Sequence, residues 1–169
     1  QEAASLIYAG LVKEGLKIVE AVRNRYRGYN RNPWDELECG HHYARAMSSW
    51  ALLLALSGFQ YDGVSQKICF SPRINHENFA TFWSTGSAWG SCGLDLEGAT
   101  LQVAGGELTV QEIDFSGRYP WEKLHSCQLA GRKIKVRYIK APHSSQLHRL
   151  IFDSPLRIKK GETLKIKCQ

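Results

Sequence analysis

The segment from Tyr43 to Tyr61 constrains the fold more than any other part of this chain, because it carries a single charged residue, Arg45. Alanine, leucine and serine fill most of the remaining positions, so a helix here is apolar on nearly every side. Such a helix is normally buried. A buried guanidinium in turn needs a carboxylate or a ligand beside it. We therefore predict a helix over residues 42–57 that requires several neighbouring elements to cover it.

The loop before this helix is rich in carboxylates. Asp35, Glu36 and Glu38 lie in it, and Glu36 precedes Arg45 by nine positions. A carboxylate accepts two hydroxyl protons and a guanidinium donates in a planar fork, so the two groups together can hold adjacent hydroxyls of a sugar ring. On the residues alone, an ion pair that merely ties the loop to the helix is the stronger interpretation of Glu36 and Arg45.

The run from Asn32 to Trp50 resembles the C-terminal catalytic-domain motif of glycoside hydrolase family 116, the bile acid β-glucosidase or non-lysosomal glucosylceramidase family. The resemblance covers residues 1–90 and is most specific over the loop. It implies that Glu36 and Arg45 hold hydroxyls of the glucose being cleaved. It also implies the terminal helical hairpin of an (α/α)6 barrel, with the nucleophilic glutamate and the acid/base aspartate upstream, outside this chain.

The activity implied by the resemblance is hydrolysis of a β-glucoside with retention, which needs no cofactor. We expect no catalytic residue in this chain, because the adjacent loop carboxylates cannot readily flank a scissile bond at the required separation of about 5 to 5.5 Å. The expected partners are the β-glucoside and the preceding part of the same enzyme, namely its N-terminal β domain and the rest of the barrel. As the last piece of a longer enzyme, the chain is expected to expose a large apolar surface over residues 1–60.

Two further residues near the loop are candidates for sugar contact. Trp34 can stack on a sugar face, although packing as a plug that holds the loop is an equally good interpretation. His42 is a candidate hydrogen-bonding residue beside the sugar. Cys39, His41 and His42 also suggest zinc, since thiolate and imidazole are zinc ligands, but nothing completes a set at a familiar spacing. We therefore predict no metal site.

The C-terminal half has a different pattern, with apolar residues at every second position from Ser87 onward. This spacing is typical of strands with one buried and one wet face. The apolar positions that mark these strands are Leu101, Val103, Leu108, Val110, Ile113, Ile134, Val136, Tyr138, 147–152, Leu164 and Ile166. Gly105-Gly106 and Lys160-Gly161-Glu162 predict hairpin turns between them.

The region between the predicted helix and these strands is rich in aromatic residues. Residues 66–70 form a candidate strand, and residues 77–82 a candidate helical turn. Trp83 and Trp89, with the nearby phenylalanines Phe79 and Phe82, are predicted to pack the junction between the helical and β portions rather than to contact substrate. We accordingly predict an α+β chain, with residues 1–90 completing the helical catalytic domain and residues 91–169 forming a small antiparallel β appendage.

Charge is distributed unevenly along the chain. Residues 1–117 hold 9 Lys and Arg against 13 Asp and Glu, a net charge of −4, whereas residues 118–169 hold 13 against 3, a net charge of +10. The basic residues alternate with apolar ones, which favours a solvated strand face over a nucleic-acid surface. A non-catalytic carbohydrate-binding or interaction module, with the β half as its working part, remains the alternative function. A nucleic-acid-binding domain is the weaker third possibility, and we predict no nucleic-acid partner.

The cysteines and the hydropathy bear on the compartment. The five cysteines form no CxxC pair, and their odd number argues against a closed disulfide framework, so we expect reduced thiols in a cytoplasmic protein. No uninterrupted apolar run is long enough for a transmembrane span, and none is predicted.

Overall fold

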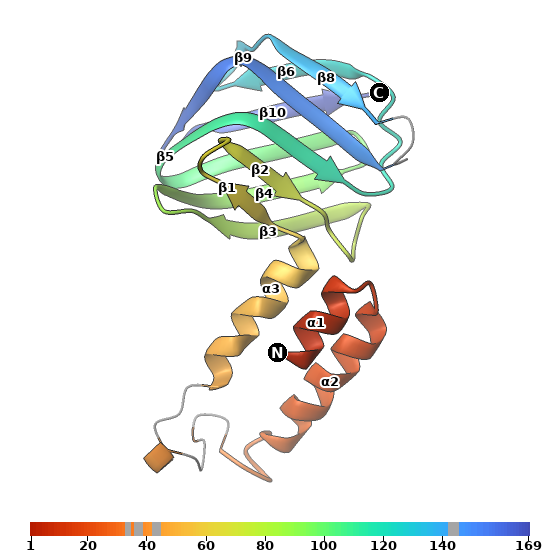
Figure 1. The fold of residues 1–169 in the computed structure, drawn as a ribbon, viewed down its shortest axis with the longest axis vertical. Helices are drawn as coiled ribbons and strands as arrows, with labels where there is room; N and C mark the ends of the chain where they lie inside the picture. The colour runs from red at the N-terminus through yellow and green to blue at the C-terminus, as the bar shows by residue number, and fades with distance from the viewer. Residues whose placement is uncertain (33–34, 36–38, 42–44, 142–145) are drawn as a thin grey trace. The chain divides into compact units, whose positions relative to one another are not determined.

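The computed structural model of the protein describes residues 1–32, 35, 39–41, 45–141 and 146–169. The chain divides into two compact units, residues 1–56 and residues 57–169. The first unit is helical and the second is built from strands (Figure 1). None of the described helices is both long and apolar enough to cross a membrane.

The helical unit is small and has a thin core. Its described elements are α1 (Glu2–Tyr8), α2 (Val12–Arg25), the short 3₁₀ helices η1 (Cys39–His41) and η2 (Arg45–Ser49), and α3 (Trp50–Ser57). Ala4 and Ile7 of α1 are buried together with Ala55 of α3. Gly15 of α2 lies against α1, because a Cβ added there would lie 2.7 Å from the carbonyl oxygen of Ala3.

Much of the apolar surface of this unit is exposed. The large exposed apolar side chains among its described residues are Tyr8, Leu11, Leu16, Val22, Tyr29, Met47, Trp50 and Leu54. The side chain of Trp50 is 64% exposed although it begins the apolar helix α3. The exposed apolar surface that the sequence predicts for residues 1–60 is therefore present.

The described residues of the β unit form ten strands in one hydrogen-bonded network. They are β1 (Gln60–Asp62), β2 (Lys67–Phe70), β3 (Asn78–Ser84), β4 (Ala88–Asp95), β5 (Gly98–Ser116), β6 (Leu124–Leu129), β7 (Arg132–Lys133), β8 (Val136–Lys140), β9 (Leu147–Lys159) and β10 (Thr163–Cys168). All of the pairings are antiparallel except that between β2 and β5.

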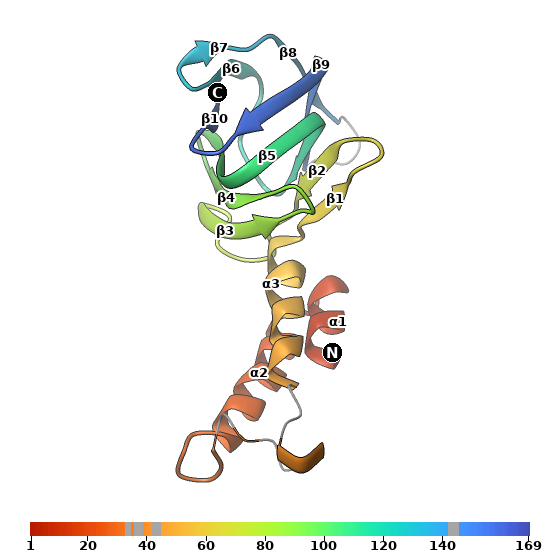
Figure 2. The same ribbon diagram turned by 90° about the vertical axis from the view of Figure 1, so that its left-hand side faces the viewer.

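The 19-residue strand β5 belongs to both halves of this network. Its first part pairs with β4 and β10, which gives the order β3-β4-β5-β10-β6-β7. Its second part pairs with β2 and β9, which gives the order β1-β2-β5-β9-β8. Buried side chains from both halves form one core, around which the strands curve (Figures 1 and 2). Leu101 and Leu164 enter this core from the first half, and Ile113 and Leu150 from the second.

Two glycines allow β5 to pass from one half to the other. Gly106 has a φ of 76°, a conformation that residues with a Cβ rarely adopt. A Cβ at Gly106 would also lie 2.0 Å from the carbonyl oxygen of Ser87. The prediction of a hairpin turn at Gly105-Gly106 is therefore wrong, because both residues lie inside the continuous strand β5.

The predicted fold class is also wrong. Most of the chain is a ten-stranded mixed sheet, and its three described α-helices are short, so it is not a helical hairpin of an (α/α)6 barrel followed by a small β unit. The strands β1, β2 and β3 and the first residues of β4 lie in residues 1–90, which the sequence assigned to the helical domain. The period-two alternation begins earlier than Ser87: Phe79, Thr81 and Trp83 of β3 are buried and the residues between them are exposed.

Several local predictions are confirmed. The candidate strand at residues 66–70 corresponds to β2, and the alternating apolar positions farther on lie in β5, β8, β9 and β10, except Ile134, which lies between β7 and β8. The turn at Lys160-Gly161-Glu162 connects β9 to β10, with Gly161 at a φ of 85°. The predicted helix ends at Ser57 as expected, before Gly58 with its φ of 58°, but its α-helical part begins only at Trp50. The candidate helical turn at residues 77–82 is not present, because β3 begins at Asn78.

Replacement of a buried residue on β5 tests the shared core. We expect Leu101→Ala, which empties a fully buried position, to lower the free energy of unfolding by about 2 to 5 kcal/mol. Leu96→Ala is the matched control, because Leu96 is 47% exposed in the turn before β5, and its effect should stay within about 0.5 kcal/mol. Urea denaturation of the full chain measures both values, and equal losses in the two variants would contradict the assigned core.

Candidate functional site

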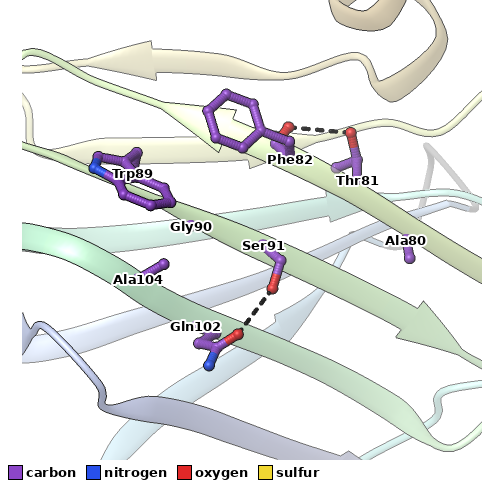
Figure 3. A pocket seen from close by; sticks show the side chains of 8 residues that line it. All are labelled: Ala80, Thr81, Phe82, Trp89, Gly90, Ser91, Gln102 and Ala104. Carbon is purple, nitrogen blue, oxygen red and sulfur yellow. Dashed lines mark hydrogen bonds between the residues drawn. The ribbon is translucent and has the colours of Figure 1, made fainter.

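An aromatic patch lies on the exposed face of the first half of the sheet. Phe82 of β3 is 45% exposed and Trp89 of β4 is 50% exposed. Their ring centroids are 6.3 Å apart, with a tilt of 38° between the ring planes. The two side chains border a shallow hollow of about 440 Å³, which Ala80, Thr81, Gly90, Ser91, Gln102 and Ala104 also line (Figure 3). We call this set of residues the aromatic face.

The orientation of Trp89 follows from the glycine opposite it. Trp89 pairs with Gly105 of β5. A Cβ added to Gly105 would lie only 2.4 Å from the indole Nε1 and 2.7 Å from Cε2. The indole therefore occupies the space that a side chain at Gly105 would fill, and it reaches across to the backbone of β5. Trp89 is half exposed, so part of the ring is available to a ligand.

Polar side chains lie next to the two rings. The Ser91 hydroxyl donates to Gln102 Oε1 across the strand pair at 3.2 Å (Figure 3). This contact uses one acceptor of Gln102 and leaves its amide N–H groups for another partner. The Thr81 hydroxyl donates to the carbonyl oxygen of Phe82 at 3.1 Å, and Thr81 is itself buried. Ser91 and Gln102 are thus the exposed hydrogen-bonding groups of the aromatic face.

A second cluster lies on the other half of the sheet and consists of ion pairs. Lys67 Nζ contacts Glu112 Oε1 at 2.6 Å and Asp114 Oδ2 at 2.7 Å. Arg149 donates to both carboxylate oxygens of Asp114, at 2.8 and 2.9 Å, and contacts Glu112 at 3.0 Å. The hydrogen bonds to Asp114 raise the pKa of the Arg149 guanidinium. Each carboxylate is therefore held between two cations, an arrangement that stabilises the sheet and does not provide a general acid.

A histidine lies in the interior of the β unit. His148 is fully buried on β9, with its Nδ1 2.7 Å from the hydroxyl of Tyr138. That hydroxyl also donates to the carbonyl oxygen of Trp121 at 3.2 Å, so we assign the Nδ1–H tautomer, which donates to the Tyr138 oxygen. Nε2 is buried and has no hydrogen-bond partner among the described residues. Burial lowers the pKa of His148 to about 4, because protonation would place an N–H where no acceptor lies.

The residues predicted to contact sugar are only partly described. Trp34, Glu36 and His42 lie outside the described residues. Arg45 begins η2, and only its backbone is described. The assignment of these four residues to a sugar site therefore stays a prediction.

The neighbouring loop residues have a partner of their own. Asp35 Oδ1 lies 2.7 Å from His41 Nδ1, so these two side chains pair with each other. Within the described part of the chain, no group of three or more metal-ligating side chains converges. The four cysteines with described side chains, Cys69, Cys92, Cys127 and Cys168, are free thiols.

Sequence reasoning missed the aromatic face. It assigned four aromatic residues to packing at the junction between the helical and β portions. Phe79 and Trp83 are instead buried in the core of the β unit, and Phe82 and Trp89 are exposed. The signal was present in the order of residues. Phe82 is one position out of phase with Phe79, Thr81 and Trp83, and Trp89 is one position out of phase with Ala88 and Cys92. In a strand, this difference places the two sets on opposite faces.

Comparisons with known proteins identify no family for this chain. No protein-family model matches the chain, and no curated protein matches it. Among solved structures, a β-arabinofuranosidase of glycoside hydrolase family 127 is similar, with 8% identity and a TM-score of 0.35. The similarity covers 62% of this chain and 18% of that protein. A TM-score this low establishes neither a common fold nor a common function.

The buried histidine predicts a pH dependence of stability. Unfolded His148 takes up a proton below about pH 6.5, and the folded protein does so only below about pH 4. Between these values the unfolded state binds more protons, so stability falls as the pH is lowered, by about 3 kcal/mol in total.

Denaturation of the full chain between pH 7 and pH 4 measures this effect. We expect His148→Gln to lose this part of the dependence and His125→Gln, at an exposed position of β6, to keep it. An unchanged slope in His148→Gln would show that the histidine is not buried in its neutral form.

Proposed function

We propose that the β unit binds carbohydrate without cleaving it, on the aromatic face. The observation that carries the proposal is the indole of Trp89, which is half exposed and lies over Gly105 with Phe82 beside it. The C–H groups of a pyranose ring pack on an aromatic ring held in this way, and the Trp89 indole supplies a large apolar surface at little entropic cost. Ser91 and Gln102 supply hydrogen-bonding groups for sugar hydroxyls.

The open form of the site supports a saccharide chain over a small compact ligand. Sites for small molecules are concave and bury most of the ligand surface. The hollow at the aromatic face is shallow, and most of the residues that line it are exposed, namely Ala80, Phe82, Trp89, Ser91 and Gln102. A chain of sugar rings can lie across such a surface and extend beyond it at both ends.

The described carboxylates support binding rather than catalysis. Glu112 and Asp114 are neighbours on β5, but Lys67 and Arg149 hold both of them. Strand β3 and the first part of β5 contain no acidic residue, and the acidic residue of β4, Asp95, accepts hydrogen bonds from the backbone N–H groups of Glu97 and Gly98. A retaining glycosidase needs two carboxyl groups on either side of the scissile bond, and no such pair lines the aromatic face among the described residues.

A second candidate function follows from the loop and helix that resemble glycoside hydrolase family 116. In this proposal, Glu36 and Arg45 hold the sugar of a β-glucoside within a longer retaining enzyme, whose catalytic carboxylates lie outside this chain. The exposed apolar side chains of Met47, Trp50 and Leu54 support it, because they suit contact with further protein. Carbohydrate binding on the aromatic face does not depend on this second role.

Substitution of the exposed tryptophan tests the first proposal. A glycan array identifies the saccharide that the full chain retains, and calorimetry then measures its affinity. We expect Trp89→Ala to weaken binding at least about tenfold, which corresponds to about 1.4 kcal/mol. Trp50→Ala is the matched control, since Trp50 is a comparably exposed tryptophan outside the sheet, and it should bind normally. Retention of no glycan, or equal losses in both variants, would overturn the proposal.

The second proposal is tested with the natural assembly. Hydrolysis of a chromogenic β-glucoside by material that contains this chain should fall at least about a hundredfold in Glu36→Ala and in Arg45→Ala, because transition-state contacts to the sugar are lost. Asp62→Ala, in the β1–β2 hairpin, is the matched acidic control and should keep its activity. A natural assembly that leaves β-glucosides intact would exclude this role.

A further inference from the structure

The exposed face of the sheet does not end at the aromatic residues. The strand registers place six residues in one row across the sheet: Ala80, Gly93, Thr100, Lys165, Gln128 and Lys133, from β3, β4, β5, β10, β6 and β7. Directly paired residues point to the same side of a sheet, so this row shares its side with the aromatic face. Gly93 is partly exposed and the other five are exposed.

A neighbouring row connects the aromatic face to the same surface. Phe82 pairs with Ser91, Ser91 with Gln102, and Gln102 with Thr163 of β10. Thr163 lies two positions before Lys165 on its strand, so the two side chains point to the same side. Adjacent strands are about 4.8 Å apart, so Lys165 on β10 lies about 10 Å from Gly93, the residue of β4 in the same row. Trp89 precedes Gly93 by four residues, about 13 Å along the strand, so its backbone lies about 16 Å from that of Lys165. An oligosaccharide that stacks on Trp89 and runs diagonally across the strands therefore reaches Lys165.

The surface beyond Gln102 is positively charged. Lys165 and Lys167 of β10 and Lys133 of β7 are all exposed, and none has a carboxylate within ion-pair distance among the described residues. The first part of β5, β10, β6 and β7 contain no acidic residue. The nearest carboxylate in sequence, Glu162 at the β9–β10 turn, accepts a hydrogen bond from the backbone N–H of Lys159. Asp95 and Glu97 lie at the β4–β5 turn, where the carbonyl oxygen of Glu97 accepts a hydrogen bond from the Cys168 N–H beside Lys167. Lys165 and Lys133 lie in the row farther from this turn.

We propose that the ligand of this face is an acidic oligosaccharide, whose sugar rings stack on Trp89 and Phe82 and whose carboxylate or sulfate groups pair with Lys165 and Lys133. This inference rests on the proposed carbohydrate binding and adds the chemical class of the ligand. Lysine side chains at solvent-exposed positions pair with an anion weakly and in a salt-dependent manner. The aromatic rings thus provide the contacts common to all sugars, and the lysines select the charged ones.

The test compares a hexasaccharide of galacturonic acid with its carboxyl-reduced form, which keeps the chain and loses the charge. Calorimetry on the full chain should give tighter binding of the acidic form, with a preference that falls at high salt. Lys165→Gln and Lys133→Gln should each reduce the preference by about twofold to fivefold and leave the reduced form unaffected. Lys17→Gln, at an exposed position of α2, is the matched control and should change neither affinity. Trp89→Ala should weaken both ligands.

Each other outcome has a definite meaning. Equal affinity for the two hexasaccharides overturns the proposal of an acidic ligand and leaves the proposed carbohydrate binding in place. If neither hexasaccharide binds and no other glycan is retained, both proposals are overturned. If a sulfated galactan hexasaccharide binds more tightly than the galacturonic acid hexasaccharide, sulfate is the recognised group. If it binds more weakly, carboxylate is the recognised group. Either result supports the proposal of an acidic ligand. A single-stranded DNA oligonucleotide that binds as tightly, and equally well to Trp89→Ala, would overturn the proposal in favour of a general polyanion surface.

Discussion

The β unit depends on a single continuous strand that supplies backbone hydrogen bonds to both halves of the network. Strand β5 pairs with β4 and β10 before Gly106, and with β2 and β9 after it. The change of direction is possible because Gly106 adopts a positive φ and carries no Cβ. The neighbouring Gly105 also leaves room for the indole of Trp89. The same two glycines therefore connect the two halves of the core and set the orientation of the ring that carries the proposed binding.

The sequence predicts the strands of the C-terminal half well, because their buried and exposed residues alternate clearly in β9 and β10. Prediction from the sequence fails where one local pattern is compatible with two different structures. Gly105-Gly106 is a strong turn signal, yet here the two glycines bend a strand that continues. The apolar segment after Arg45 predicted one long buried helix, but α3 has 8 residues and Trp50 at its start is exposed. The helical-barrel prediction depended on that segment and on the resemblance, and the long-range pairing of ten strands was not visible in either.

The candidate site was also only partly predictable from the sequence. The exposure of Phe82 and Trp89 could have been predicted from their phase in the alternation, since the buried Phe79 and Trp83 define the opposite face. The proximity of these rings to Lys165 could not, because it depends on β10 pairing with β5 across more than sixty residues of chain. Non-local register of this kind is set by packing and not by local propensity. The roles of Glu36 and Arg45 stay predictions from the resemblance.

The central claim is that the exposed face of β3, β4 and the first part of β5 is the surface that binds sugar. Chemical-shift mapping of the isotopically labelled full chain, during titration with the retained oligosaccharide, tests this claim most directly. Our account predicts that the shifted amides cluster around Phe82, Trp89, Ser91 and Gln102, with the indole N–H of Trp89 among the most affected signals. Shifts that instead cluster on β2, β9 and the second part of β5, around Lys67 and Arg149, would contradict it.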